Sequence, residues 1–454
     1  MKHRILVFLS VALTLAILFS LQAPAIQATP TLQDATPTPA PEEEAAAATG
    51  EEAAPQLATA SAVVDLSNQF GRTLVTARKN TFIVDSAPPL GHPSEEMNPV
   101  EAMLAALGTC GIVVYETAAQ ELDIPLTAAT VTIQGDFDVR GLTGAADVDP
   151  RVQEYRAHFD LEGPDAAQAD ALFEQWSLRC PIYTTLIKTA PIVVTNNDEE
   201  MGGPSAEGLA TATIAVSLSN QPGRTIVNVR DNYLIVDSVP PLGGPNLEVN
   251  PMDLFLSALG SCGAVIIEKA AIDYDIPLDG VTGAVEADFD PRGLTDGAIN
   301  PAVQAMRVNW EIGTESDEDA EFLIDQWLTR CPIYNTMIRA TDIEVSHRLK
   351  GEGTALLDIT FSYNLPSDEF QAEISPLAEQ FAAADGLIWK IWALDEANSQ
   401  FSGMLLFEDD AAMQTFLEGE LAAAVMAHPA LSDFEVTPFS IMSEETMITG
   451  GPIR

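Results

Sequence analysis

Apolar and polar residues alternate in two short runs, which are followed by a long segment with few polar positions. The runs RTLVTAR (72–78) and NTFIVDS (80–86) alternate with a period of two, which predicts the two strands of a hairpin. Asn98 and Pro99 then have the form of a helix N-cap and a first helical residue. The residues from there to about Leu122 are apolar nearly all round, so we expect a helix buried in the core.

Four further elements follow from the same pattern. The stretch TAATVTIQGDFDV (127–139) reads as a strand, and DAAQADALFEQWSLR (165–179) reads as an amphipathic helix. Cys180 and Pro181 open a turn or short helix, and APIVVTN (190–196) closes the unit as a strand. The side of the amphipathic helix expected to pack inward carries Ala171, Leu172, Gln175, Trp176 and Leu178.

This order of elements occurs twice in the chain. NQFGRTLVTARKNTFIVDSAPPLGH from Asn68 pairs with NQPGRTIVNVRDNYLIVDSVPPLGG from Asn220, and QWSLRCPIYTTLIK (175–188) pairs with QWLTRCPIYNTMIR (326–339). The offset is 152 residues at the first cysteine (262 − 110) and 151 at the second (331 − 180), so one residue is missing between them. Each unit has the size of a domain rather than of a short solenoid repeat.

From about Gly353 the repeat ends and the order of elements changes. The segments read as strand, helix, two paired strands, helix and strand, which is the ferredoxin-like β-α-β-β-α-β order. We therefore expect an α+β protein with two copies of one domain and a different third domain. The expected boundaries are residues 61–196 and 212–347 for the copies, 197–211 for the linker between them, and 353–454 for the third domain.

The first 60 residues have a different composition. A short basic stretch, an apolar run and small residues read as an export signal over residues 1–28, followed by an acidic, Thr/Pro/Ala-rich linker over residues 29–60. We therefore expect an extracytoplasmic protein, secreted or tethered by an uncleaved signal anchor.

The net charge of the chain argues against some classes of binding partner. There are 67 Asp and Glu residues against 21 Lys and Arg, which gives a formal net charge of −46. This charge argues against nucleic acid and against stable contact with an anionic membrane surface, because both need clustered Lys and Arg. With no cysteine spacing of the zinc type and few histidines, we expect no metal and no cofactor.

The only cysteines are two in each copy, Cys110 with Cys180 and Cys262 with Cys331. A structural disulfide, an inert buried pair and a redox-active pair all fit this arrangement. Cys180 and Cys331 precede prolines at expected helix starts, where unpaired N–H groups favour a thiolate. The two cysteines inside the long helices would need a nearby cation to favour the thiolate form. The candidates are Arg72, Arg78, Arg224 and Arg230, and for any one of them an ordinary surface ion pair with a carboxylate is the favoured alternative.

The segments VDSVPPLGGPNLEVNPMDLFLSALGSC, IPLDGV and RCPIYNTMI resemble the OsmC/Ohr family of thiol-dependent peroxide reductases, over about 62–194 and 212–345. The resemblance implies two domains packed as an intrachain pseudo-dimer, a small hydroperoxide as substrate and an unidentified thiol as reductant. It implies that Cys110 and Cys262 attack the peroxide and that Cys180 and Cys331 resolve the product as a disulfide. Arg72 and Arg224 are the nearest matches to the family's catalytic arginine.

One position departs from the family's pattern in both copies. Members that reduce organic hydroperoxides carry a Glu directly after the Asn-Pro pair, where this chain has Val100 and Met252. Glu101 and Asp253 follow one residue later, a step that turns a helical side chain by about 100°.

The segments GLIWKIWALDEANSQFSGMLLFED and SPLAEQFAAADG resemble small mono-oxygenase-like proteins with the dimeric α+β barrel fold, over about 353–454. The resemblance implies a homodimer formed through this domain. Trp389, Trp392 and Phe407 are expected either to line a pocket or to fill the core and the interface.

Two functions follow from these observations. The first is an exported hydroperoxide reductase that works through the cysteine pairs, with an accessory mono-oxygenase-like domain. The second is a non-catalytic binding or scaffold protein with structural disulfides and a C-terminal dimerisation domain.

Glu116 and Glu268, six residues after the helix cysteines, are either buried acids near the site or residues at an exposed edge.

Overall fold

The computed structural model describes residues 55–91, 94–350, 353–442, 446 and 449. The predicted signal segment (1–28) and most of the predicted linker (29–60) lie outside these residues. The first described strand, β1, begins at Ala58.

The two copies contain corresponding elements in the same order, with one short α-helix of the first replaced by a 3-10 helix in the second. The first has β1 (Ala58–Leu66), β2 (Arg72–Ala77), β3 (Asn80–Asp85), η1 (Pro88–Leu90), α1 (Pro99–Glu121), β4 (Ala128–Phe137), α2 (Val139–Leu142), β5 (Val152–Glu162), α3 (Ala166–Arg179), α4 (Pro181–Leu186) and β6 (Ile192–Asn196). The second has β7 (Ala210–Leu218), β8 (Arg224–Val229), β9 (Asn232–Asp237), η2 (Pro240–Leu242), α5 (Pro251–Asp273), β10 (Val281–Phe289), η3 (Pro291–Leu294), β11 (Ala305–Ile312), α6 (Asp317–Arg330), α7 (Pro332–Met337) and β12 (Ile343–Leu349). The predicted hairpins and long helices are therefore present in both copies.

Neither of the two six-stranded sheets belongs to one copy alone. One sheet has the order β6-β5-β4-β7-β8-β9 and the other β12-β11-β10-β1-β2-β3, so each joins three strands of one copy to three of the other. The exchange occurs at the antiparallel pairs β4–β7 and β1–β10, where Ile133 faces Ile214 and Ala62 faces Val285. Backbone hydrogen bonds thus fuse the copies into the pseudo-dimer that the resemblance implied.

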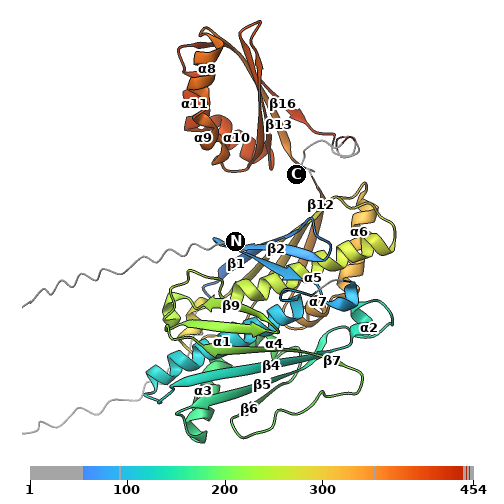
Figure 1. Cartoon of the computed structure of the whole chain (residues 1–454), viewed down its shortest axis with the longest axis vertical. Coiled ribbons are helices and arrows are strands. Elements are labelled where there is room, and N and C mark those ends of the chain that lie inside the picture. The colour runs from blue at the N-terminus through green and yellow to red at the C-terminus, as the bar shows by residue number, and fades with distance from the viewer. Residues whose placement is uncertain (1–54, 92–93, 351–352, 443–445, 447–448, 450–454) are drawn as a thin grey trace, which may run out of the picture. The chain divides into compact units, whose positions relative to one another are not determined.

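The long helices α1 and α5 lie against each other between the two sheets (Figure 1). Both begin with the predicted asparagine cap and proline, and Glu101 or Asp253 completes a capping box three residues after the cap. By length and composition each helix is apolar enough to cross a membrane, but most of each is buried inside the protein. One hydrophobic core runs through both copies and includes both helices.

Two glycines let these helices lie directly on the sheets. A Cβ at Gly108 would lie 2.9 Å from Val216, and one at Gly260 would lie 2.7 Å from Val64. In each case the valine belongs to the other copy, so this glycine of the ALGTCG and ALGSCG segments is required by the exchanged strands. The close contact fixes the position of the cysteine two residues further along the helix.

The C-terminal domain has its own four-stranded sheet, in the order β14-β15-β13-β16, and its own core. Its elements are β13 (Ala355–Tyr363), α8 (Ser367–Ile374), α9 (Leu377–Ala382), β14 (Leu387–Asp395), β15 (Gln400–Phe407), α10 (Asp410–Glu418), α11 (Glu420–Met426) and β16 (Leu431–Ser440). The ferredoxin-like order is confirmed, but each expected helix is two short ones. Pro376 separates α8 from α9 because proline lacks a backbone N–H, and Gly419 separates α10 from α11 in an extended conformation.

The inward side of α3 also differs from the expected one. Leu178 is 42% exposed, whereas Arg179 beside it is buried. Arg179 binds Glu121 and donates from Nε to the carbonyl oxygen of Leu294 in the other copy, at 2.9 Å. The guanidinium therefore takes an inward position because it has partners there, which the hydrophobic pattern alone does not reveal.

Candidate active site: two buried cysteine pairs

The fold brings together the two cysteines of each copy, which are about seventy residues apart in sequence. Cys110 and Cys180 form a disulfide, with their Cα atoms 6.1 Å apart. Cys262 and Cys331 are free thiols whose Sγ atoms lie 2.6 Å apart. The structure thus contains one oxidised and one unbonded pair in equivalent positions.

Cys180 and Cys331 occupy the junction between two helices. Cys180 ends α3 by donating its N–H to the carbonyl oxygen of Trp176 and begins α4 by accepting the N–H of Tyr183 on Sγ, at 3.3 Å. Cys331 does the same with Trp327 and Tyr334. The proline that follows each cysteine suits the first position of a helix. The sulfur therefore serves as a helix cap and is held toward the long helix.

A second glycine, directly after each long-helix cysteine, admits a tryptophan beside the sulfur pair. A Cβ at Gly111 would lie 3.2 Å from the ring of Trp176, and one at Gly263 would lie 2.3 Å from Trp310 and 3.2 Å from Trp327. The indole N–H groups of all three tryptophans are buried without a hydrogen-bond partner. Aromatic rings therefore pack closely beside both pairs.

The aromatic walls of the two pairs differ. In the first copy Tyr115 stacks on Phe159 with ring centroids 4.3 Å apart. In the second copy Ile267 and Trp310 occupy the corresponding positions, and Trp310 packs on Trp327 with centroids 5.1 Å apart. The larger indole fits because Gly283 leaves space on β10, where a Cβ would lie 2.4 Å from the ring. The two pairs therefore have different surroundings.

Access to the sulfurs is narrow. Cys110 and Cys262 are 4% and 3% exposed, and Cys180 and Cys331 are fully buried. Burial raises the pKa of the Cys262 thiol, the contact with Cys331 raises it further, and the N–H of Ile333 opposes both effects only in part. Cys262 is therefore held mainly as a neutral thiol at neutral pH.

Arg72 and Arg224, the arginines expected to activate the cysteines, are engaged elsewhere. Arg72 binds Asp85 and Glu95, at 2.6 and 2.9 Å, and Arg224 binds Asp237 at 2.6 Å. Burial would raise the pKa of Asp85, but the hydrogen bonds from Arg72 and from two backbone N–H groups outweigh it and lower that pKa.

The direction of the Arg72 side chain follows from its neighbour in β2. The Thr73 hydroxyl lies 2.9 Å from that of Ser261, next to Cys262, and successive side chains of a strand point to opposite faces. Arg72 therefore points away from the α5 helix. A catalytic role for Arg72 and Arg224 remains a prediction.

Arg78 and Arg230, the other two candidates, link the copies. Arg78 binds Asp253 at 2.6 Å, and Arg230 binds Glu101 at 2.8 Å. These are the acids that stand one position after Val100 and Met252. Each of these acids makes two interactions: it completes the capping box of its own helix, and it binds an arginine of the other copy.

Glu116 and Glu268 also bind across the copies. Glu116 accepts the N–H of Gly223, and Glu268 accepts the N–H of Gly71, each at 2.7 Å. Burial raises the pKa of both, and that of Glu268 reaches about 7. They line cavities of about 540 and 450 Å³ that no cysteine lines, so these acids are partly buried but are not at the sulfur pairs.

The three aromatic residues expected at a C-terminal pocket lie in different parts of that domain. Trp392 lines a cavity of about 680 Å³. Phe407 is buried in the core against Phe416, and Trp389 lies on the opposite face of β14 from Lys390. Sequence analysis did not single out Lys390, which lines the cavity. The sequence feature that could have indicated Lys390 is that it is the single basic residue in the otherwise apolar stretch LIWKIWAL.

Comparison with family models gives two matches. The OsmC-like protein family matches residues 91–196 and 244–346, and the family described as "Putative mono-oxygenase ydhR" matches residues 356–452. The two OsmC matches begin after the N-terminal hairpins of the copies. No curated protein matches the chain.

Among solved structures, an OsmC-like protein from Mycoplasma pneumoniae is 19% identical, covering 30% of this chain and 94% of its own, with a TM-score of 0.27. SnoaB from Streptomyces nogalater, described as a cofactor-independent oxygenase, is 17% identical over 20% of this chain and 94% of its own, with a TM-score of 0.18. MhuD from Mycobacterium tuberculosis, described as a heme-degrader, is 14% identical over 19% of this chain and 95% of its own, with a TM-score of 0.17.

Proposed function

We propose that the cysteine pairs of this protein reduce hydroperoxides. The premise is that both tandem domains match the OsmC-like protein family and that the domain after them matches the ydhR-like mono-oxygenases. The observation that carries the proposal is the approach of the sulfurs in both copies, bonded in one and 2.6 Å apart in the other. A pair at such a distance can pass between dithiol and disulfide without rearrangement of the fold.

The chemistry takes three balanced steps. A thiolate attacks the O–O bond and, with one proton, gives a sulfenic acid and an alcohol. The second thiol of the pair condenses with the sulfenic acid to give the disulfide and one water. Two equivalents of an external thiol then restore the dithiol and leave as their own disulfide.

Burial supports Cys110 and Cys262 as the attacking residues. They retain a few per cent of exposure, whereas Cys180 and Cys331 have none, so a peroxide that enters reaches the helix cysteines first. Cys180 and Cys331, held by the backbone at helix starts, are placed to resolve the sulfenic acid. The raised pKa of Cys262 implies a slow attack at neutral pH that becomes faster as pH rises and the thiolate forms.

Trapping of the intermediate tests this assignment. In the full-length Cys180→Ser, Cys331→Ser variant, reduced and then treated with cumene hydroperoxide and dimedone, we expect adducts on Cys110 and Cys262. The matched Cys110→Ser, Cys262→Ser variant should give little adduct on the remaining cysteines. Adducts confined to Cys180 and Cys331 would reverse the roles, and the absence of adducts in both variants would refute the chemistry.

A second candidate function is a scaffold in which the cysteines only stabilise the fold. The near-complete burial of all four sulfurs favours it, because a structural disulfide needs no access. It predicts that both pairs are disulfides in the native protein and that peroxide does not change the reduced protein faster than free cysteine.

We further propose that the protein acts outside the cytoplasm, with the basic and apolar start of the chain as the export signal. Fractionation of cells expressing the full chain tests this location, with a variant lacking residues 2–28 as the control. The full chain is expected outside the cytoplasmic membrane or attached to it, and the shortened chain in the cytoplasm.

A further inference from the structure

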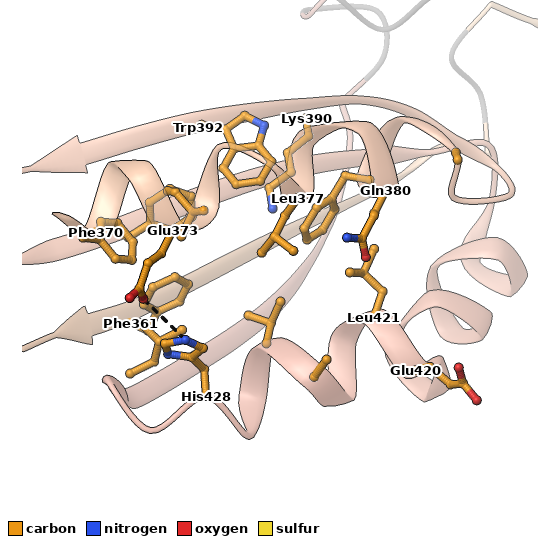
Figure 2. Close-up of a pocket in the computed structure, with 17 residues that line it drawn as sticks. Phe361, Phe370, Glu373, Leu377, Gln380, Lys390, Trp392, Glu420, Leu421 and His428 are labelled. Atoms are coloured by element: carbon orange, nitrogen blue, oxygen red, sulfur yellow. Dashed lines mark ion pairs between the residues drawn. The ribbon is translucent and has the colours of Figure 1, made fainter. Parts of the chain in front are cut away.

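The C-terminal domain has an open-sided cavity of about 680 Å³ between its sheet and its helices (Figure 2). This volume suits a small organic molecule. Most of its wall is apolar and comes from the sheet and from α8, α9 and α11. The main apolar residues are Phe361, Leu377, Phe381, Trp392, Phe401 and Leu421.

Lys390 on β14 extends its side chain into this cavity (Figure 2). Its Nζ lies 3.2 Å from the ring centroid of Phe381, 3.7 Å from that of Trp392 and 5.8 Å from that of Phe401. Within the described parts of the chain this amine has no hydrogen-bond or ion-pair partner. The cavity therefore contains an amine that lies against the faces of aromatic rings.

Burial favours the neutral form of the Lys390 amine, against the cation–π attraction of the rings beside it, which favours the charged form. Burial lowers its pKa to about 7. At pH 7 about half of such amines are unprotonated, against roughly one in 2,500 for an ordinary lysine. An unprotonated amine is a nucleophile toward a carbonyl carbon, and desolvation in an apolar pocket is a recognised way to obtain one.

The other polar groups of the cavity lie away from the amine. His428 and Glu373 face each other with Nε2 and Oε2 3.5 Å apart, and both are about half exposed (Figure 2). Gln380 and Glu420 also line the cavity. The ionisable groups that face the cavity besides Lys390 are thus two carboxylates and one histidine.

We propose that this cavity binds an apolar aldehyde or ketone and that Lys390 forms an imine with it. The amine adds to the carbonyl carbon, and the resulting carbinolamine loses one water to give the C=N bond, with no oxidant or reductant required.

The charge of the cavity favours a neutral carbonyl compound over a carboxylic acid. Glu373 and Glu420 already supply two negative charges against the one that Lys390 can carry. A ligand carboxylate would add a third negative charge beside these two, which is unfavourable. A carbonyl compound adds none, and its apolar body fits the aromatic wall.

Reductive trapping of the full-length protein tests the proposal. The protein is treated briefly with hexanal and cyanoborohydride at pH 7, and the adduct on each lysine is measured by peptide mass spectrometry. We expect at least tenfold more adduct on Lys390 than on Lys79 or Lys188, two exposed lysines in the same molecule. Equal labelling of the three lysines would overturn the proposal.

Two controls separate the cavity from the amine. Lys390→Arg keeps a positive charge and should abolish labelling at this position while labelling of Lys79 and Lys188 is unchanged. The second control uses the wild-type protein and glycolaldehyde, a polar aldehyde. The ratio of labelling by hexanal to labelling by glycolaldehyde should be higher at Lys390 than at Lys79. The same preference at both lysines would show that no apolar cavity is involved and would contradict the proposal.

The pH dependence gives an independent readout. The labelling at Lys390 relative to that at Lys79 should be greatest near pH 6 and should fall as pH rises to 9, because the reducing agent is common to both lysines and the ratio reports on the amines alone. Parallel profiles for Lys390 and Lys79 would refute a reactive amine in the cavity.

Discussion

Arg230, just after β8, binds Glu101 at the start of α1, with Nη2 and Oε2 2.8 Å apart. Arg78, just after β2, binds Asp253 of α5 in the corresponding way. Each ion pair joins the hairpin of one copy to the long helix of the other. The same acids close the capping boxes of the helices that carry Cys110 and Cys262, so the pairing of the copies and the placement of the cysteines depend on the same side chains.

Removal of one arginine should therefore destabilise the paired copies. Arg78→Ala leaves Asp253, whose side chain is 4% exposed, without its cation. We expect the free energy of unfolding to fall by about 1–3 kcal/mol, measured by guanidinium denaturation. Arg348→Ala is the matched control, because its pair with Glu311 is more exposed and the expected loss is below about 0.5 kcal/mol. Equal losses in the two variants would contradict a special role for the link.

Glu268 should make stability depend on pH in an unusual direction. Its pKa is about 7 in the folded protein, above the ordinary value of 4.5, because it is buried. The folded state therefore binds the proton more tightly, and the stability contributed by the protonated acid is lost as pH rises from about 4.5 to about 7.

Glu268→Gln keeps an oxygen for the N–H of Gly71 and removes the titration. Relative to wild type, the variant should gain up to about 2 kcal/mol between pH 4.5 and pH 8, once solvent screening of this partly exposed acid is included. Denaturation at both pH values measures the gain. A constant difference between variant and wild type would show that Glu268 does not titrate in this range.

The glycine after each long-helix cysteine should be unequally sensitive in the two copies. Gly263→Ala places a Cβ 2.3 Å from Trp310, whereas Gly111→Ala places one 3.2 Å from Trp176. We expect Gly263→Ala to cost about 1–3 kcal/mol of stability and Gly111→Ala less. Thermal unfolding of the two variants compares them. A larger loss for Gly111→Ala would contradict the packing described for the second pair.

The C-terminal domain should hold two chains together through the outer face of its sheet. Ile391 and Met404 lie opposite each other on β14 and β15 and are 47% and 36% exposed. Ile391→Lys combined with Met404→Lys should convert a dimer to a monomer in analytical ultracentrifugation. Ile83→Lys, at a residue of the tandem domains that is 41% exposed, is the control and should leave the dimer intact. Dimerisation that survives the double change would place the interface elsewhere.

Local patterns in the sequence were sufficient to predict most of the elements. The alternating runs became β2 and β3, and the cap at Asn98 began the long helix. The exchange of strands between the copies could not be derived from these patterns, because β1 has the same alternation whether it pairs within its copy or with β10. Only the resemblance indicated that the copies pair.

The candidate site was predictable in part, for a similar reason. Duplicated cysteines at matching positions pointed to the two sulfur pairs. Arg72 and Asp85 face each other in the predicted hairpin, whereas Arg78 and Asp253 are far apart in sequence, so no local pattern specifies that second ion pair. Lys390 was missed because a single basic residue in an apolar strand is common, and its significance comes from the rings that surround it.

Consumption of cumene hydroperoxide by the dithiol-reduced full-length protein, followed by stopped flow beside the Cys110→Ser, Cys262→Ser variant, tests the central claim most directly. We predict that wild type consumes up to two equivalents of peroxide per chain, one for each pair, and forms a disulfide for each equivalent consumed. The rate should increase with pH, and the variant should show neither the consumption nor the disulfides. Equal, slow consumption by the two proteins would contradict the assignment of peroxide reduction to the cysteine pairs.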